Sequence, residues 1–438
     1  MQDENTLREV AKDCVHCGFC LPACPTYQLW AEEMDSPRGR IYLVNQILDG
    51  APLSASAAEH FDRCLGCMAC MTACPSGVQY DQLIEAARVW TEEARSSAPA
   101  VEAATPGRTV RERVARAAIF SVFPYPRRLR ALTAPLRVAQ RTGLDRRLAR
   151  SSLPERVSPV LGAALRLAPR AGASALGTRP LPERVPALGP RRAVVGMLTG
   201  CVQSVFFPQV NVATARVLAA EGCDVIIPRG QGCCGALSLH SGREAEAAAF
   251  ARRTIAQFEQ AGVDAVVVNS AGCGSAMKEY GRLLGQAGPG WTERAAEMSG
   301  KVRDLAEFLA EIGPVARRHP LPVTAAYHDA CHLAHAQRIT KQPRELLRAI
   351  PGLNLVEVPD AGTCCGSAGV YNLLQPEAAS ELGDRKAESV LAAGAPLLIS
   401  ANPGCSLQIA SALARRGQDI AVAHTAEVLD ASIRGRPL

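Results

Sequence analysis

The stretch CVHCGFCLPACP, residues 14–25, decides the fold, because the same pattern returns as CLGCMACMTACP at residues 64–75. Both copies read Cys-x2-Cys-x2-Cys-x3-Cys-Pro. Runs of this kind hold pairs of [4Fe–4S] clusters, and the fourth cysteine of each run ligates the cluster of the other run. The spacing therefore predicts two crossed ligand sets. They are Cys14, Cys17, Cys20 and Cys74 for one cluster, and Cys64, Cys67, Cys70 and Cys24 for the second.

Zinc is the alternative occupant, since Cys-x2-Cys pairs also bind zinc. A zinc ion takes four ligands, and that requirement does not explain a third cysteine and a Cys-Pro at the same places in both runs. The pattern favours iron–sulfur clusters.

Composition indicates a reducing compartment. The 438 residues include 17 cysteines, and the groups described here have the spacing of metal ligands. The opening residues MQDENTLREVAKD are polar, so no secretory signal is expected. No stretch approaches the ~18 uninterrupted apolar residues of a membrane span. We expect a cytoplasmic protein that meets a membrane, if at all, from its surface or through a partner.

Charge is concentrated in one segment. The net charge is +6, yet residues 101–192 hold 19 Arg, no Lys and five acidic residues. Such a basic segment suits anionic lipid or an acidic partner subunit. The alternative is a solvated linker whose arginines pair with neighbouring domains. Nucleic acid is not expected, because no recognition motif and no aromatic platform accompany the arginines.

Apolar periodicity divides the chain into four parts. We expect a helical ferredoxin-type domain with two [4Fe–4S] clusters over 1–95, a basic helical linker over 96–192, and two α/β domains over 193–320 and 321–438. The 39 residues between Cys24 and Cys64 fit a helix-rich variant of the ferredoxin domain better than the compact fold.

Helix signals support the first two parts. Ser36-Pro37 predicts a helix start, since Ser caps helices and Pro suits the first turn. A further helix is expected over 81–95. In the linker, short helices are expected over 111–120 and 127–147, with an interruption at Pro135.

Residues 193–438 contain an internal repeat. Short apolar runs alternate with helical patterns, which predicts parallel sheets. The expected strands cover 193–199, 224–228 and 264–269, then 324–328, 354–359 and 396–401. Each strand leads to a cysteine or to Cys-Cys-Gly, and matching cysteines are 130 to 132 residues apart. The repeat predicts two copies of one domain packed as pseudo-symmetric halves.

Each repeat offers a possible further metal site. The cysteines are Cys201, Cys233, Cys234 and Cys273 in the first repeat and Cys331, Cys364, Cys365 and Cys405 in the second. All follow the carboxyl ends of expected strands, where open parallel sheets bind ligands. A third iron–sulfur cluster, zinc or no metal are all compatible with four cysteines.

Three histidines flank Cys331, namely His328, His332 and His335. Any of them could supply a further ligand to a metal held by the cysteines of the second repeat, or a proton. The alternative is that they lie outside the ligand set or are simply packed.

The paired Cys-Cys-Gly repeats resemble subunits of heterodisulfide reductase, in which such cysteines hold unusual iron–sulfur clusters. That family usually ends its motif with Cys-x2-Cys. This chain has Cys273-Gly274-Ser275-Ala276 and Cys405-Ser406-Leu407-Gln408, so the fifth cysteine is missing in both repeats.

Over essentially its whole length, the chain resembles the iron–sulfur subunits of glycolate oxidase, a membrane-associated glycolate dehydrogenase. The resemblance is carried by both cysteine runs, DSPRGRIYLVNQIL (35–48), NVATARVL (211–218), GCCGA (232–236), SAGCG (270–274), KEYG (278–281) and CCGSAG (364–369). Iron–sulfur subunits of anaerobic glycerol-3-phosphate dehydrogenase and proteins of lactate utilisation are similar.

The resemblance implies an electron-transfer subunit of a hetero-oligomer. A separate FAD subunit would oxidise glycolate, or D-lactate, to glyoxylate or pyruvate, and this chain would pass electrons toward a quinone at the inner face of the cell membrane. The sequence agrees, because it has no G-x-G-x-x-G opening a helix after a strand and no P-loop, so FAD is expected on the partner only. The alternatives are a subunit of another FAD-linked dehydrogenase, for lactate or glycerol 3-phosphate, and a heterodisulfide-reductase-like enzyme.

Overall fold

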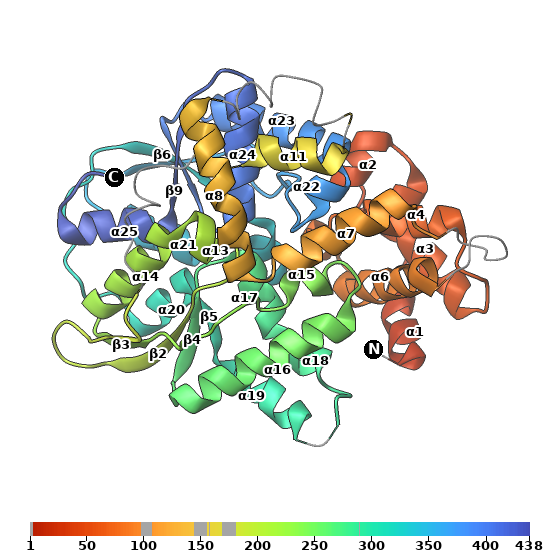
Figure 1. Cartoon of the computed structure of the whole chain (residues 1–438), viewed down its shortest axis with the longest axis horizontal. Helices are drawn as coiled ribbons and strands as arrows, with labels where there is room; N and C mark the ends of the chain where they lie inside the picture. The colour runs from red at the N-terminus through yellow and green to blue at the C-terminus, as the bar shows by residue number, and fades with distance from the viewer. Residues whose placement is uncertain (1–2, 98–106, 144–155, 157, 169–180, 289) are drawn as a thin grey trace.

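The computed structural model describes residues 3–97, 107–143, 156, 158–168, 181–288 and 290–438 (Figure 1). The N-terminal helices form one end of the molecule, the two α/β repeats form the rest, and the linker helices cross the front between them (Figure 1). Part of the expected helix over 127–147 falls outside the described residues.

The N-terminal part is helical, as the sequence predicts. Its elements are α1 (Glu4–Lys12), α2 (Pro25–Trp30), the 3-10 turn η1 (Glu33–Asp35), α3 (Pro37–Leu48), α4 (Ala55–Arg63), α5 (Ala69–Ala73) and α6 (Tyr80–Ser97). The Ser36 hydroxyl caps α3 by accepting from the Gly39 amide. The core of this part includes Leu7, Val44, Phe61, Leu83 and Ile84.

The linker forms α7 (Val110–Val122), α8 (Pro126–Thr142) and α11 (Pro159–Leu167). The expected interruption at Pro135 is wrong, because α8 continues through it. A proline removes one helical hydrogen bond, but packing of neighbouring turns can maintain the helix. Here Leu129 and Thr133 are buried on one side of α8, and Pro135 is exposed.

The first repeat is built on a five-stranded sheet of order β1-β3-β2-β4-β5. Only β1 runs antiparallel to its neighbour. The strands are β1 (Arg184–Val185), β2 (Ala193–Leu198), β3 (Cys223–Ile226), β4 (Ala265–Val268) and β5 (Val302–Asp304). The helices are α13 (Gln203–Phe206), α14 (Pro208–Ala220), α15 (Ala236–Leu239), α16 (Glu244–Ala261), α17 (Ala271–Lys278), α18 (Tyr280–Leu283), α19 (Trp291–Lys301) and α20 (Leu305–Ile312).

The second repeat has a four-stranded, all-parallel sheet of order β7-β6-β8-β9. The strands are β6 (Thr324–His328), β7 (Asn354–Glu357), β8 (Leu397–Ser400) and β9 (Ala421–His424). The helices are η2 (a π-helix, His332–Ala336), α21 (Lys341–Arg348), α22 (Tyr371–Leu374), α23 (Pro376–Ala392), α24 (Pro403–Arg415) and α25 (Thr425–Arg434).

The two repeats pack as matching halves, which confirms the expected fold class. Strands β3-β2-β4-β5 correspond in order to β7-β6-β8-β9. Helix α14 of the first repeat packs on α25 of the second, and its counterpart α21 packs on α20 of the first. One apolar core runs across both repeats, including Val195, Leu218, Tyr327 and Leu429. This shared core holds the carboxyl ends of the two sheets in a fixed relation.

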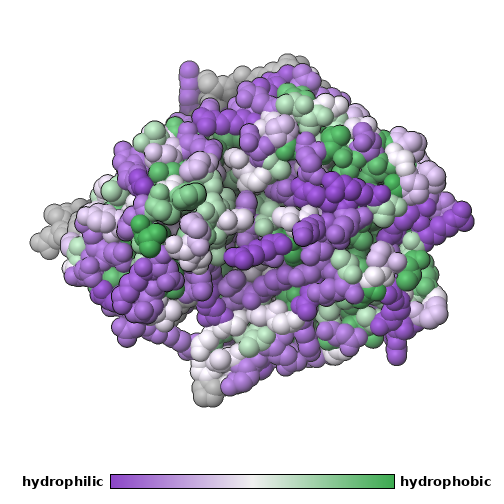
Figure 2. All heavy atoms as spheres, turned by 180° about the vertical axis from the view of Figure 1, so that it is seen from behind, coloured by the Kyte–Doolittle hydropathy of each residue, from purple (hydrophilic) through white to green (hydrophobic). Residues whose placement is uncertain are grey.

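The face of the molecule opposite to that of Figure 1 is mostly hydrophilic, with apolar residues in small separate groups (Figure 2). Among the helices that the structure describes, none is both long and apolar enough to cross a bilayer.

Candidate metal centres

The two N-terminal cysteine runs share one backbone conformation. In each run the second and fourth residues after the first cysteine have positive φ: His16 and Gly18 in the first run, Gly66 and Met68 in the second. Left-handed backbone is uncommon for residues other than glycine, and it clusters at functional sites. The two runs therefore make the same left-handed turns between their first three cysteines.

The structure brings Cys74 of the second run to Cys14, Cys17 and Cys20 of the first. All four line one small cavity, together with Cys70. Cys17 is exposed, and Cys14, Cys20 and Cys74 are partly buried. The neighbouring Val15 and Phe19 are 68% and 65% exposed. The first run therefore faces the surface beside exposed apolar side chains.

The other group of four is deeply buried. Cys24 lies near Cys64, Cys67 and Cys70, and all four are buried. The Sγ of Cys24 is 3.2 Å from the Thr26 hydroxyl. Because the fourth cysteine of each run joins the other run, the geometry is that of the crossed ligand sets, which remain a prediction.

Electrostatics at the second group favour metal binding. Burial raises the pKa of Cys64, but Arg40, Arg88 and the Gly66 amide outweigh it and lower the pKa overall. Burial and neighbouring thiols raise the pKa of Cys67 and Cys70 well above the ordinary value. Thiols packed this closely become thiolates together only if a cation compensates their charge. A positively charged iron–sulfur core fits that requirement.

Buried hydrogen bonds hold the side chains of Arg40 and Arg88 in place. Arg40 is 1% exposed and donates to the carboxylate of the equally buried Asp35 at 3.1 Å. Asp35 also accepts from Arg63 at 3.1 Å and lies 3.0 Å from the His60 Nδ1. Arg88 donates to the Cys64 carbonyl at 2.5 Å. Fixed charges of this kind bear on the redox potential of a nearby cluster.

The second run docks onto the second repeat. His332 Nε2 lies 2.9 Å from the Gly66 carbonyl, and the Thr72 hydroxyl lies 2.9 Å from His335 Nδ1. Cys67 packs in one buried cluster with Cys331 and Cys364. The cysteines of the second run therefore adjoin those of the second repeat.

Within each repeat the four cysteines are brought together. In the first, Cys233 interacts with both Cys201 and Cys234, and Cys234 with Cys273. In the second, the same order joins Cys331, Cys364, Cys365 and Cys405. We call these groups the first and second tetrads. The single cysteines follow β2 and β6, and the pairs follow β3 and β7. Cys273 and Cys405 lie in the first turns of α17 and α24.

The glycine after each cysteine pair has a geometric role. Gly235 and Gly366 have φ of +95° and +85°. A Cβ would lie 3.0 Å from the Ala247 carbonyl oxygen at Gly235 and 2.7 Å from that of Ala379 at Gly366. Glycine thus permits both the left-handed turn and the close contact with α16 or α23.

Both tetrads line one cavity of about 420 Å³, which sequence reasoning did not anticipate. The linker helices provide its apolar wall, with Leu129, Leu132 and Leu136 on α8 and Leu161 and Leu165 on α11. Leucines spaced by three and four residues are the sequence signal that could have revealed this wall. The linker therefore does more than connect domains.

Two polar side chains on the cavity wall lack partners. Gln203 is 2% exposed, and its amide N and O have no hydrogen-bond partner among the described residues. Both ring nitrogens of His240 are likewise unpartnered, and the ring stacks edge-on against His332. Burial and His332 hold the pKa of His240 well below its ordinary value, so its ring is neutral. Buried polar groups of this kind suit a ligand with hydrogen-bonding atoms.

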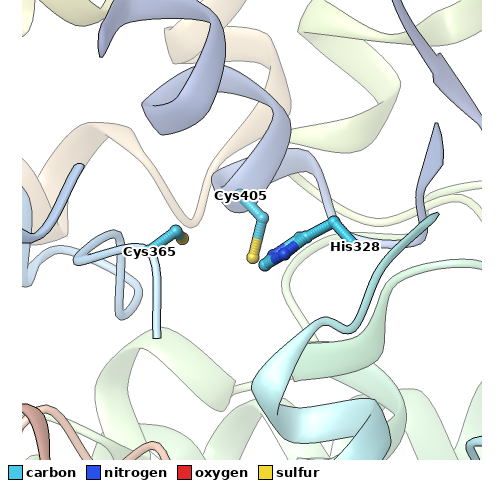
Figure 3. A group of neighbouring side chains, drawn as sticks. All are labelled: His328, Cys365 and Cys405. Carbon is cyan, nitrogen blue, oxygen red and sulfur yellow. The ribbon is translucent and has the colours of Figure 1, made fainter. Parts of the chain in front are cut away.

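The structure separates the three expected histidines. His332 and His335 contact the N-terminal domain, as described above. His328 instead faces the second tetrad, where its ring nitrogen and the sulfurs of Cys365 and Cys405 lie within 4.8 Å of one another (Figure 3).

Comparison with known proteins agrees with this geometry. Residues 10–78 match the 4Fe-4S dicluster domain, residues 195–278 and 325–410 match the cysteine-rich domain, and residues 111–168 match the linker region of the glycolate oxidase iron-sulfur subunit. A probable glycolate oxidase iron-sulfur subunit from Bacillus subtilis is 36% identical over 95% of this chain and 93% of its own length. The chain belongs to the glycolate oxidase iron–sulfur subunit family.

Other relatives extend the comparison. The glycolate oxidase iron-sulfur subunit of Escherichia coli is 35% identical over 92% of this chain and 90% of its own length. Lactate utilization protein A of Exiguobacterium is 32% identical over 55% of this chain and 98% of its own. As an iron–sulfur subunit of the glycolate oxidase family, the chain is a 4Fe-4S protein with two cysteine-rich repeats.

Proposed function

We propose that this chain is the electron-transfer subunit of a glycolate dehydrogenase complex. An FAD subunit oxidises glycolate, or D-lactate, to glyoxylate or pyruvate, and this chain carries the two electrons toward a quinone-type acceptor. The observation that carries the proposal is the spatial order of the cysteine groups. The partly exposed group around Cys17 adjoins the buried group around Cys67, Cys67 adjoins the second tetrad, and both tetrads line one cavity.

The N-terminal cysteines would hold two [4Fe–4S] clusters. Cys14, Cys17, Cys20 and Cys74 would bind one cluster, and Cys64, Cys67, Cys70 and Cys24 the other, as their convergence supports. When bound, the clusters supply one-electron storage and transfer. The protein's own contribution is to hold the thiolates, to place Arg40 and Arg88 beside the buried group, and to exclude water from it.

The face of the first run would receive the flavoprotein. Cys17 is exposed between Val15 and Phe19, which are large apolar residues on the surface. Apolar and aromatic side chains of this kind are common anchors of protein interfaces. Docking here would bring the donor subunit next to the first ligand set.

The cavity would receive the acceptor. Its leucine wall suits an apolar ring, and Gln203 and His240 offer unsatisfied hydrogen-bonding groups for its carbonyl oxygens. Reduction of a quinone takes up two electrons and two protons. Glycolate oxidation on the partner releases the same numbers, so the overall reaction balances.

The linker would lie against the membrane. Arg127 and Arg130 on α8 are exposed, as are the apolar Leu132 and Val138. Basic residues beside exposed apolar ones favour binding to anionic lipid surfaces. This supports a peripheral position on the inner face of the cell membrane.

The decisive experiment is anaerobic co-purification with the native partners, followed by addition of glycolate, D-lactate or glycerol 3-phosphate. We expect a flavoprotein to co-purify and glycolate to bleach the flavin and iron–sulfur absorption fastest. If no flavoprotein co-purifies and no hydroxy acid bleaches the clusters, the proposal fails. Disulfide reduction by the chain with a chemical donor would then favour a heterodisulfide-reductase-like enzyme.

A further inference from the structure

His328 is a buried histidine without a structural partner. Its side chain is 1% exposed, and neither ring nitrogen has a hydrogen-bond partner among the described residues. An unpaired imidazole in a protein interior is unfavourable and calls for an explanation. A ring nitrogen and the sulfurs of Cys365 and Cys405 lie within 4.8 Å of one another, with the ring turned toward Cys405 (Figure 3).

The first repeat provides an internal comparison. His328 ends β6 and pairs in register with Ser400 of β8, whereas Leu198 ends β2 and pairs with Val268 of β4. The two residues therefore occupy equivalent positions. Leu198 packs in an apolar cluster with Cys234. The repeats thus place a leucine beside the first tetrad and an imidazole beside the second.

A buried cation lies beside the second tetrad. Lys386 is 2% exposed, donates to the Asp360 carbonyl at 2.7 Å and lies near the cysteines of the second tetrad. A neutral imidazole has a free nitrogen lone pair, and this is the form in which histidine binds metals.

We propose that His328 is a nitrogen ligand of an iron–sulfur centre held by Cys331, Cys364, Cys365 and Cys405, so that the two repeats hold chemically different centres. The first tetrad offers thiolates alone. In the second tetrad, His328 supplies a fifth ligand, where related proteins have a fifth cysteine that this chain lacks. Cys365, Cys405 and His328 reach the site from the loop after β7, from α24 and from the end of β6.

A functional consequence follows from ligand charge. An imidazole is neutral and a thiolate is anionic, so replacing sulfur by nitrogen ligation raises the reduction potential of an iron–sulfur centre. The second-repeat centre is therefore expected at a higher potential than an all-thiolate centre of the same type. Since the second tetrad adjoins Cys67, such a centre would draw electrons out of the N-terminal domain.

The test uses the full chain, purified anaerobically after growth with 15N-histidine or unlabelled histidine. Pulsed electron paramagnetic resonance of the reduced protein should show a nitrogen coupling that changes with the label. In His328→Leu, which copies Leu198, that coupling should vanish. His319→Leu removes a histidine that the structure places near the C-terminal Gly435 instead, and it should keep the coupling.

Three further measurements sharpen the test. In His328→Cys a thiolate takes the place of the imidazole. The second-repeat centre should then form without nitrogen coupling and with a lower reduction potential. Cys365→Ser should abolish the coupled signal, which assigns it to the second repeat. Folding of each variant is checked by the retained signals of the N-terminal clusters.

Three results would overturn the assignment. They are a second-repeat iron–sulfur signal without histidine coupling, a coupling that persists in His328→Leu, and stoichiometric zinc with no iron beyond the two N-terminal clusters. The inference rests on the proposed function only in assuming that the second tetrad holds iron. Failure of glycolate to reduce the complex would leave the nitrogen coupling intact, so the two failures are distinguishable.

Discussion

A cysteine in this chain takes its role from its neighbours. Cys223 shows the contrast, because it is buried in β3 within the shared apolar core and belongs to neither N-terminal run nor tetrad. Burial raises its pKa to about 11, so it remains a thiol at neutral pH. Cys64 is also buried, yet Arg40 and Arg88 lower its pKa.

Replacing Cys67 by Ser should therefore remove one cluster. Cys67 adjoins Cys331 and Cys364, so the cluster that it is predicted to hold would lie where the N-terminal domain meets the second repeat. We expect iron content to fall by about four per chain and acceptor reduction to be blocked. Iron analysis and electron paramagnetic resonance check this. Cys223→Ser is the matched control and should keep all its iron. Retention of both clusters and full activity in Cys67→Ser would contradict the ligand assignment.

The glycine of the second Cys-Cys-Gly allows a separate residue-scale prediction. Gly366 has a φ of +85°, and the Cβ that Gly366→Ala adds would lie 2.7 Å from the Ala379 carbonyl oxygen. Gly394→Ala has φ +66° but no contact within 4 Å among the described residues. We expect Gly394→Ala to lose about 1 kcal/mol of unfolding free energy and Gly366→Ala roughly 2 kcal/mol more. Urea denaturation measures both, and equal losses would show that the contact relaxes freely.

At the scale of elements, the two repeats use equivalent helix caps of different chemistry. Asp304 caps α20 and His424 caps α25, each in a capping box with a glutamate three residues later. Burial lowers the pKa of His424 to about 4 and raises that of Asp304 to about 7. The same geometry therefore gives the two repeats opposite titration behaviour.

The Asp304 cap predicts a pH dependence of stability. Its folded-state pKa of about 7 exceeds the ordinary value of 3.8, so between these values the folded chain binds an extra proton. Its contribution to stability is then present at low pH and is lost as pH rises toward 7, by up to about 1.4 kcal/mol per pH unit. Asp304→Asn keeps the capping oxygen and should reduce this slope. Denaturation at pH 5.5, 6.5 and 7.5 tests it, and identical slopes in the two proteins would refute it.

At the scale of the whole molecule, partly buried ion pairs join the N-terminal domain to the first repeat. Arg282 on α18 lies 3.2 Å from the Asp81 carboxylate and 2.9 Å from that of Glu85, both on α6. These contacts hold α6, which follows the second cysteine run, against the first repeat. The arrangement depends on charges from distant parts of the sequence.

Removing this cation should weaken the docking of the domain. Arg282→Met leaves Asp81 and Glu85 largely buried without their partner, which should cost about 3 kcal/mol of unfolding free energy. Arg294→Met removes an exposed arginine paired with Glu259 and should change stability much less. Chemical denaturation of both variants checks the difference. A loss no larger than that of Arg294→Met would mean that the domain is held by other contacts.

The sequence by itself determined the local features of this protein. Cysteine spacing indicated two crossed ligand sets, and strands alternating with helices indicated parallel sheets. The repeat of 130 to 132 residues indicated two matching domains. These features depend on ligand spacing, side-chain period and turn residues, which are local properties that a sequence displays directly.

Tertiary structure alone decided what lies between these parts. It turned His328 toward the second tetrad while Leu198 occupies the equivalent place in the first. It also placed both tetrads on one cavity and laid the leucines of α8 and α11 over it. Such contacts join residues far apart in the chain, and the packing of whole domains selects them. The physical reason is that a spacing pattern specifies what a residue can bind, whereas only the assembled fold specifies what it meets.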